Sequence, residues 1–336
     1  NKHRDHPLLG FRLNSIDGVW LNQIDLLSHP YLADHVVDGL TIFPASGFVE
    51  MALAASRSWF GRDTVGISSL EIRKPLIFEP GKTRVTQFQL STGDLHFSIR
   101  SRDRLTDNVW TEHANGRLVN TVSAHRQKQQ DYDRLANIAG TLINSNQIYA
   151  TAALCGLEYG QKFRGAIEVL LTSEEVSYTE LMLPEDILAQ HHEYLWHPVI
   201  MDSAFHALFS QLRTRLGDGV KPDAYVPVEM NELRYYGNNA VTIARSKCIL
   251  HSVSGNIVRA SFIFYSGTGL VVAEISECLF RRLPRQEKLK GSPAYYEYRT
   301  IPKNLINSCE LTPVTRIEEL LMEIAGLPDM DGVVAN

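Results

Sequence analysis

A ten-residue motif in the N-terminal part of the chain combines a histidine with the start of a helix. It reads HxxxGxxxxP, with His35, Gly39 and Pro44 at its defined positions. Gly39 allows a tight backbone bend. The residues from Pro44 onward predict a helix whose first N–H groups, near Ala45 and Ser46, lack partners within the helix. An imidazole next to such donors suits a reaction in which negative charge develops on an oxygen atom.

A second motif places an acid on a helix that is otherwise apolar. It reads HPxxxDxxxH and begins at His197, with Asp202 and His206 at its later positions. Because residues four apart share one face of a helix, the side chains of Asp202 and His206 are predicted to lie next to each other. An aspartate in apolar surroundings is costly unless it is paired or used. Asp202 is therefore a candidate functional residue.

Two long helices are predicted to position these residues. One covers residues 44–55 and has an apolar face, and the other covers residues 198–215 and is apolar nearly all round, as in a helix buried by its surroundings. Segments rich in β-branched and aromatic residues, separated by turns, follow each helix and predict antiparallel strands. These segments are 65–78, 84–90, 96–100 and 109–122 after the first helix, and 224–228, 232–236, 241–253, 257–265 and 270–280 after the second.

A helix followed by antiparallel strands thus occurs twice, which predicts an α+β fold with two similar halves. Between the halves we expect a polar linker at residues 123–134, followed by a helix from about residue 131 to 154. The tail has helical periodicity at residues 312–325. The chain stops at residues 333–336 without an evident cap, which is typical of a cut through a larger polypeptide.

The composition argues against several classes of protein. The chain has 336 residues, 44% hydrophobic and 21% charged, which is ordinary for a folded protein of two domains. Lys and Arg number 33 and Asp and Glu 38, a net charge of −5 with no basic cluster, so we do not expect a nucleic-acid binder. No apolar run approaches the ~20 residues of a membrane span. Residues 1–6 are polar with no apolar segment behind them, so no signal peptide is predicted.

Common cofactor and metal motifs are also missing from the sequence. It contains no GxGxxG, GxxxxGK[ST], HExxH or GxSxG pattern. The cysteines have no CxxC spacing, and their small number predicts buried thiols in a reducing cytoplasm rather than a disulfide framework. They are Cys155, Cys248, Cys278 and Cys309. We therefore expect a cytoplasmic protein that uses neither a cofactor nor a metal ion.

The motifs resemble those of dehydratase domains from modular type I polyketide synthases. The resemblance includes HxxxGxxxxP, HPxxxDxxxH and, between them, the string Tyr159-Gly160-x-x-Phe163-x-Gly165, in the order typical of the family. The opening string His6-Pro7-Leu8-Leu9-Gly10 is also typical of the start of such domains.

This resemblance covers residues 6 to about 285 and implies a double hotdog fold, in which two antiparallel sheets each wrap a central helix. The N-terminal half, residues 1–130, would carry the catalytic histidine, and the C-terminal half, residues 131–285, the catalytic aspartate. Residues 286–336 would form a linker or tail between domains.

The reaction implied by the resemblance is the removal of water from a 3-hydroxyacyl thioester carried by an acyl carrier protein. His35 would take the α-proton and Asp202 would protonate the departing β-hydroxyl group. A neutral imidazole suits the role of base near neutral pH, and burial in an apolar pocket favours the neutral acid form of a carboxyl group. Backbone N–H groups at Ala45 and Ser46, after the bend at Gly39 and Pro44, would hold the thioester oxygen as enolate charge builds.

Other residues are assigned supporting roles by the same resemblance. His206 would hydrogen-bond Asp202 and orient it, and Tyr159 would line the pocket and donate a hydrogen bond to the substrate. The remaining pocket residues would be Phe163, Arg164 and Gly165. The chain departs from the family pattern at Ala45, where Gly is frequent, at Gln161, where Pro is common, and at Arg164, where Gln is common. The last two changes concern the shape of the pocket rather than the His–Asp pair.

Alternative functions stay open at this stage. Relatives with the same fold shift double bonds or close cyclic ethers, usually with loss of the aspartate or the motif proline, whereas Asp202 and Pro44 are both present here. A catalytically idle scaffold domain or an acyl-binding module would need neither His35 nor Asp202. An unrelated hotdog thioesterase would not explain the ordered motifs. The expected partners are an acyl carrier protein with its phosphopantetheine arm, other domains of the same synthase, and a second copy in a homodimer, without nucleic acid, membrane or metal.

Overall fold

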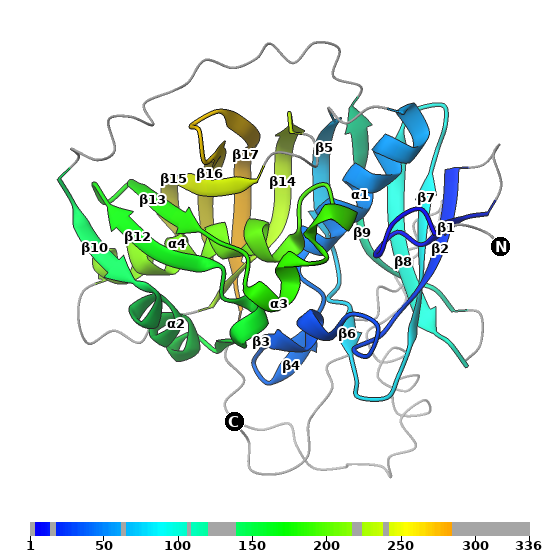
Figure 1. Cartoon of the computed structure of the whole chain (residues 1–336), viewed down its shortest axis with the longest axis horizontal. Coiled ribbons are helices and arrows are strands. Elements are labelled where there is room, and N and C mark those ends of the chain that lie inside the picture. Colours follow the sequence, from blue (N-terminus) through cyan, green and yellow to red (C-terminus); the bar gives the residue numbers. More distant parts are fainter. Residues whose placement is uncertain are drawn as a thin grey trace, which may run out of the picture. The chain divides into compact units, whose positions relative to one another are not determined.

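A computed structural model of the chain describes residues 4–13, 18–61, 65–105, 109–119, 139–216, 224–237 and 242–283. These belong to one compact unit that spans residues 1–285 (Figure 1). The linker predicted at residues 123–134 and the helix predicted at residues 312–325 lie outside the described residues.

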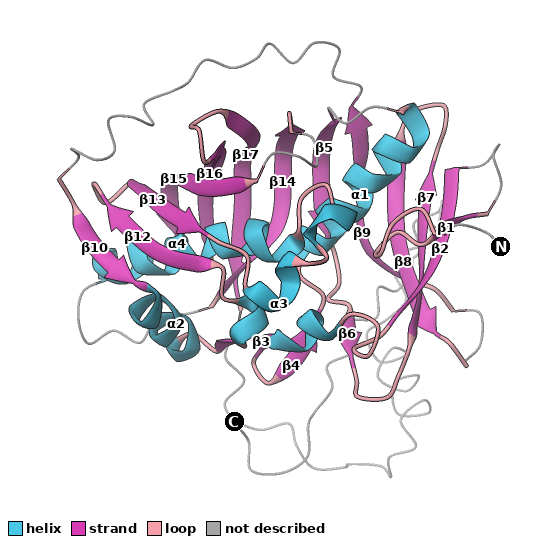
Figure 2. Ribbon diagram, in the orientation of Figure 1, coloured by secondary structure: helices cyan, strands magenta, loops and turns pink. Residues whose placement is uncertain are grey.

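Strands make up most of the described fold, and four α-helices accompany them (Figure 2). The helices are α1 (Ala45–Phe60), α2 (Ser145–Leu154), α3 (Glu185–Leu188) and α4 (Pro198–Leu216), with short 3-10 turns at Pro30–Asp34, Gln161–Phe163 and His191–Glu193. The first nine strands are β1 (Phe11–Arg12), β2 (Gly18–Ile24), β3 (His35–Val37), β4 (Leu40–Ile42), β5 (Val65–Ile72), β6 (Ile77–Phe78), β7 (Arg84–Leu90), β8 (His96–Asp103) and β9 (Thr111–Val119). The others are β10 (Thr141–Asn144), β11 (Leu157–Tyr159), β12 (Ala166–Leu171), β13 (Val176–Leu181), β14 (Tyr225–Tyr235), β15 (Ile243–Ser254), β16 (Ile257–Ser266) and β17 (Val271–Arg282).

The strands of the two halves join edge to edge in one antiparallel sheet. Its thirteen described strands follow the order β1-β2-β7-β8-β9-β5-β14-β17-β16-β15-β13-β12-β10, and β5 of the first half pairs with β14 of the second. Helix α1 packs on β5 and β9, and α4 packs on β12, β13 and β15. The two helices also pack against each other. The predicted α+β fold with two helix-and-sheet halves is therefore confirmed.

A second, four-stranded sheet has the order β11-β3-β4-β6. It connects parts of the chain that are far apart in sequence, because β3 carries His35 and pairs with β11, which carries Tyr159. Two of the three predicted site motifs are therefore held in register by backbone hydrogen bonds.

The predicted helix at residues 131–154 is wrong over part of its length. Residues 141–144 form strand β10, and the helix α2 begins only at Ser145. Asn144 explains this boundary because its side chain accepts a hydrogen bond from the Gln147 N–H, while the Gln147 side chain accepts one from the Asn144 N–H. This capping box fixes the start of the helix, and the residues before it pair with β12 instead. Residues 131–138 lie outside the described part.

Most of the other predicted elements lie close to their observed positions, but the strand segment predicted at residues 65–78 is divided between β5 in the large sheet and β6 in the four-stranded sheet. Helix α1 runs on to Phe60 and ends at Gly61, which adopts a positive φ of 65°. The strands predicted at 224–228 and 232–236 form the single strand β14, with a bulge between Pro227 and Glu229. Within the described residues the cysteines at 155, 248 and 278 are buried thiols, and Cys309 lies outside them. No helix of the described part is long and apolar enough to cross a membrane.

Buried histidines make the stability of this fold sensitive to acid. Burial lowers the pKa of His29 and His113 to about 4 and that of His197 to about 3. Because the unfolded chain takes up protons near pH 6.5 that the folded chain excludes, stability is present above this pH and is lost as the pH falls from about 6.5 toward 4. At pH 5, each of these histidines is expected to lower the free energy of unfolding by up to about 2 kcal/mol relative to neutral pH.

We expect His113→Gln to weaken this dependence, because a glutamine cannot take up a proton. His113 is hydrogen-bonded to the Ser101 Oγ atom at 2.7 Å and to the Lys74 carbonyl oxygen at 3.1 Å. The measurement is the free energy of unfolding in urea at pH 7 and pH 5, with His251→Gln, at an exposed position, as the control. Equal pH dependence in His113→Gln and the wild type would contradict the prediction.

Candidate active site

His35 is held in one orientation by the short β3–β4 hairpin. Asp38 and Gly39 form its turn with positive φ values of 49° and 78°, the geometry of a type I′ hairpin. The hairpin brings the Ile42 carbonyl oxygen to 2.7 Å from the Nδ1 atom of His35. Since a carbonyl oxygen only accepts hydrogen bonds, Nδ1 carries the proton, and Nε2 of the neutral ring keeps its lone pair. Gly39 itself is exposed, and a Cβ atom there would meet open space.

Helix α1 begins immediately after this hairpin. Pro44 is its N-cap residue, with extended backbone angles, and the Pro44 carbonyl oxygen accepts a hydrogen bond from the Gly47 N–H at 2.9 Å. The N–H groups of Ala45 and Ser46 therefore lie in the first turn, where an α-helix supplies no acceptors of its own. The Ser46 side chain is fully buried, and its hydroxyl group has no hydrogen-bond partner in the described part of the chain.

His35 and Asp202 face each other across the two halves. The His35 Nε2 atom lies 3.7 Å from the Asp202 Oδ2 atom, and the two residues are only 7% and 4% exposed. This distance is longer than that of a good hydrogen bond. The lone pair on His35 Nε2 therefore accepts no strong hydrogen bond from the Asp202 carboxyl group. The two predicted reacting groups are thus brought together in a site that is largely closed to water.

His206 supports Asp202 from one turn further along α4. Its Nε2 atom lies 3.2 Å from the Asp202 Oδ2 atom, and its Nδ1 atom lies 3.3 Å from the hydroxyl group of Tyr149. Burial lowers the pKa of His206, although the hydrogen bond to Asp202 opposes this effect. The Tyr149 hydroxyl also accepts a hydrogen bond from the Ala166 N–H at 3.0 Å, so it is fixed between α2 and β12. The Asp202 carboxyl group therefore has a buried, mainly neutral imidazole as its neighbour.

Aromatic rings form the wall beside this pair. Tyr159 is the strand partner of His35, with ring centres 5.7 Å apart, and its ring centre lies 4.1 Å from that of His206. Phe163 is fully buried with its ring centre 4.9 Å from that of His35. Burial, together with the nearby Asp202, raises the pKa of Tyr159 well above its ordinary value. Tyr159 is therefore a neutral phenol at physiological pH.

The last two predicted pocket residues, Arg164 and Gly165, contact residues that surround the His–Asp pair. The Arg164 Nε atom donates to the Tyr159 carbonyl oxygen at 2.9 Å, and its guanidinium group lies over the ring of Tyr149. The Gly165 N–H donates to the Ser203 Oγ atom at 3.0 Å, next to Asp202 on α4. A Cβ atom on Gly165 would lie 2.7 Å from that oxygen, so only glycine allows this approach.

Two buried polar residues that contact the site or the segment before α4 were not identified from the sequence. Tyr149 lies in the segment predicted as one long helix, and no motif marks it. Glu50 is a fully buried acid on α1, where most of the other buried residues are apolar. It therefore shows the same pattern as Asp202, an acid on an apolar helix. Among the described residues, no three His, Cys, Asp or Glu side chains form a group that could hold a metal ion.

Comparison with known proteins finds the same family as the sequence motifs do, along most of the chain. The family model "Polyketide synthase dehydratase domain" matches residues 6–102, and the model "Polyketide synthase dehydratase N-terminal domain" matches residues 127–290. One protein of the phenolphthiocerol/phthiocerol polyketide synthase from Mycobacterium tuberculosis is 25% identical over 295 residues, which cover 84% of this chain and 16% of that protein. Polyketide synthase GfsA from Streptomyces halstedii is 29% identical over 300 residues, 86% of this chain and 4% of that protein. The chain thus spans only a small part of these relatives.

Solved structures of similar domains share the fold. The dehydratase domain from the CurJ module of curacin polyketide synthase has a TM-score of 0.74 at 22% identity and covers 83% of this chain and 97% of its own. The dehydratase domain of a mycocerosic acid synthase-like polyketide synthase has a TM-score of 0.72 at 19% identity, covering 82% of this chain and 96% of its own. At these identities the likeness concerns the fold, and it confirms the predicted double hotdog.

Proposed function

The chain belongs to the dehydratase domains of polyketide synthases, and from this premise we propose that it removes water from a 3-hydroxyacyl thioester to give an α,β-unsaturated thioester. The observation that carries the proposal is the pair formed by His35 Nε2 and Asp202 Oδ2, 3.7 Å apart and nearly buried. One group has a lone pair to accept a proton, and the other can deliver one.

The proposed step transfers two protons on one side of the substrate. Nε2 of His35 takes the proton from the α-carbon, the electron pair forms the Cα–Cβ double bond, and the Cβ–O bond breaks. The protonated carboxyl group of Asp202 gives its proton to the leaving hydroxyl, which departs as water. Because the two groups approach each other so closely, they serve the same face of the substrate, as a syn elimination requires.

The surrounding residues have supporting roles in this proposal. The N–H groups of Ala45 and Ser46 stabilise the thioester oxygen as it gains negative charge, because the start of a helix favours an anion. His206 orients the carboxyl group of Asp202, and Tyr159 and Phe163 line the pocket. The turn at Gly39 and the cap at Pro44 keep His35 and α1 in place.

The presence of both Asp202 and Pro44 favours dehydration over the related reactions of this fold. A double-bond-shifting isomerase or a pyran-forming cyclase usually lacks one of these two residues. A scaffold domain without activity would have no need for a base whose proton-bearing nitrogen is held by a carbonyl group. Dehydration is therefore the function that the geometry supports best.

The proposed substrate is carried on the phosphopantetheine arm of an acyl carrier protein, and the reaction needs no cofactor. Other domains of the same synthase are the further proposed partners, together with a second copy in a homodimer. We propose a cytoplasmic location and a division into halves at residues 1–130 and 131–285, followed by a linker at 286–336.

The experiment that tests the function is intact-mass spectrometry of a carrier-bound 3-hydroxyacyl thioester incubated with the protein. The expected result is the loss of one water molecule, which stops when either His35 or Asp202 is replaced. An unchanged mass in the presence of folded wild-type protein would contradict the proposed function.

Arg164 is proposed to meet the phosphate group of the phosphopantetheine arm, since a guanidinium group binds phosphate oxygens well. We expect Arg164→Ala to raise KM about tenfold for a carrier-bound substrate, a loss of roughly 1.4 kcal/mol in binding. A truncated thioester that lacks the phosphate should show almost no change. Lys162→Ala, which removes a nearby positive charge, is the matched control. Equal losses on both substrates would contradict the proposal and assign Arg164 to its contacts with Tyr159 and Tyr149.

A further inference from the structure

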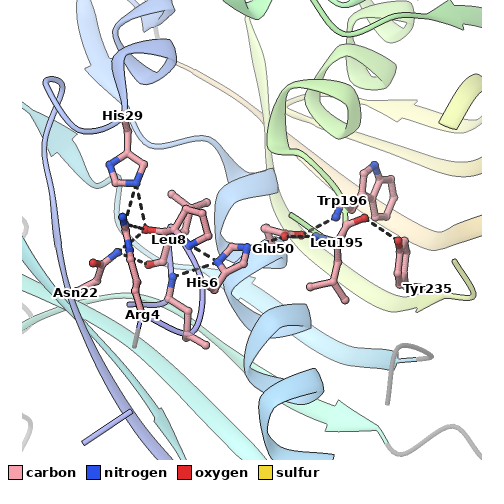
Figure 3. Close-up of polar contacts among 11 residues, drawn as sticks. Arg4, His6, Leu8, Asn22, His29, Glu50, Leu195, Trp196 and Tyr235 are labelled. Atoms are coloured by element: carbon pink, nitrogen blue, oxygen red, sulfur yellow. Dashed lines mark hydrogen bonds and ion pairs between the residues drawn. The ribbon is translucent and has the colours of Figure 1, made fainter. Parts of the chain in front are cut away.

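Glu50 is a buried acid that the proposed reaction does not use. It lies on α1 with no exposed surface, and burying a carboxylate is costly unless donors surround it. Glu50 has three such contacts, which Figure 3 shows on both sides of its side chain. Its Oε1 atom lies 2.9 Å from His6 Nε2 and accepts the Leu195 N–H at 2.7 Å, and its Oε2 atom accepts the Trp196 N–H at 3.0 Å.

The two backbone donors belong to the segment that leads into α4. Leu195 and Trp196 come three and two residues before Pro198, where α4 begins. From the opposite side, the Tyr235 hydroxyl of β14 donates to the Leu195 carbonyl oxygen at 2.6 Å (Figure 3). His197 then caps the helix, because its Nδ1 atom accepts the Val199 N–H at 3.2 Å. The start of α4 is thus held from α1 and from β14.

The third contact connects the N-terminal segment, residues 4–10, to the carboxylate of Glu50. The His6 Nδ1 atom accepts the Leu8 and Leu9 N–H groups at 3.1 and 3.3 Å, so Nε2 of the neutral ring carries the proton and donates to Glu50. Asn22 secures this segment independently, because its Nδ2 atom donates to the carbonyl oxygens of Pro7 and Leu8. His6 therefore completes the set of donors around Glu50, and Asn22 on β2 holds the segment that carries His6.

We propose that Glu50 is a positioning residue that sets where Asp202 lies relative to His35. Helix α1 follows directly from the hairpin that orients His35, and α4 carries Asp202 in its second turn. Glu50 is the side chain of α1 that binds the backbone immediately before α4. The 3.7 Å approach of the His–Asp pair therefore depends on this carboxylate. The expected effect of Glu50 on the reaction rate rests on the proposed function. Its expected effect on the position of Asp202 rests on the geometry alone.

The first test is Glu50→Gln, which keeps the size of the side chain but turns one acceptor into an N–H₂ group facing a donor. We expect kcat for water loss to fall about ten- to a hundredfold, because a displacement of about 1 Å of a reacting group can cost this much. We expect KM to change less than about twofold, since no substrate contact is removed. Tyr235→Phe removes the hydrogen bond from the Tyr235 hydroxyl to the Leu195 carbonyl oxygen. It is expected to lower kcat about three- to tenfold.

The second readout is NMR of ¹⁵N-labelled histidine side chains, which does not depend on activity. The His206 signal reports the contact with Asp202, and Asp202→Asn shows how it moves when that contact changes. We expect Glu50→Gln and Tyr235→Phe to move it in the same direction, while the signal of His113 stays in place. If the wild type proves unable to remove water, this measurement still decides whether Glu50 positions Asp202.

The matched control is Ser101→Ala, which removes the buried hydrogen bond to His113 and leaves the contacts of Glu50 and of the start of α4 intact. It is expected to lower the melting temperature but to leave kcat of the folded protein and the His206 signal unchanged. If Glu50→Gln does not fold, Tyr235→Phe alone decides. The proposal is overturned if the folded variants keep kcat within about twofold of the wild type, or if the His206 signal does not move.

Discussion

Replacement of His35 by alanine is expected to slow the loss of water by about 10²–10⁴-fold, the usual contribution of a general base. The reason is that the α-proton of a thioester is weakly acidic and its removal needs a base, which the Nε2 atom of His35 provides beside Asp202. The measurement is the rate of water loss by intact-mass spectrometry of the carrier-bound substrate. Deuterium exchange at the α-carbon of recovered substrate, measured in D₂O, should fall in parallel.

Two comparisons make the His35 result specific. His251→Ala removes a histidine from the exposed face of β15 and should leave the rate unchanged. The melting temperature of His35→Ala should show that the protein is folded. Water loss at the wild-type rate in folded His35→Ala protein would remove His35 from the reaction.

Replacement of Asp202 by asparagine is the second large effect, with an expected loss of about 10²–10⁴-fold in the rate of water release. An asparagine has the same size as the acid but cannot give a proton to a leaving hydroxyl group. Because His35 stays in place, α-carbon exchange should remain within about threefold of the wild type, as no base is removed. The two assays therefore separate the acid from the base.

Asp186→Asn, at an exposed position on α3, is the control for the Asp202 variant and should keep the wild-type rate. An equal loss of exchange and of water release in Asp202→Asn would show that Asp202 acts through His35 and not as the acid. In the wild type, exchange without water loss would favour an isomerase or cyclase. Neither exchange nor water loss would leave a scaffold domain.

Much of the local structure followed from the sequence because it depends on neighbouring residues. Pro44 marks the start of α1, and segments rich in β-branched and aromatic residues predicted most of the strands that follow α1 and α4, whereas β2–β4 and β10–β13 were not predicted. The error at residues 141–144 has a local cause as well, since the Asn144–Gln147 capping box decides the start of α2 more strongly than helical periodicity does. The family resemblance came from motifs that are each short and contiguous in the chain.

The candidate site was predicted in part, for a physical reason. His35, Asp202 and His206 could be named because each lies in a contiguous motif, HxxxGxxxxP or HPxxxDxxxH, that resembles the family's. Tyr149 could not be named, because its role arises from a contact with His206 across two helices. Glu50 carried the same signal as Asp202, but two of its partners are backbone N–H groups that no sequence pattern displays.

The sequence by itself therefore determined the chemical groups, the two long helices with most of the strands that follow them, and the resemblance to the family. Only the tertiary structure decided how these groups meet. Pairing of β3 with β11 places Tyr159 beside His35, and packing of α1 against α4, with Glu50 holding the start of α4, brings His35 within 3.7 Å of Asp202. Such contacts join residues that are distant in the chain, and they form because each half can bury its helix only when the strands and the other helix enclose it.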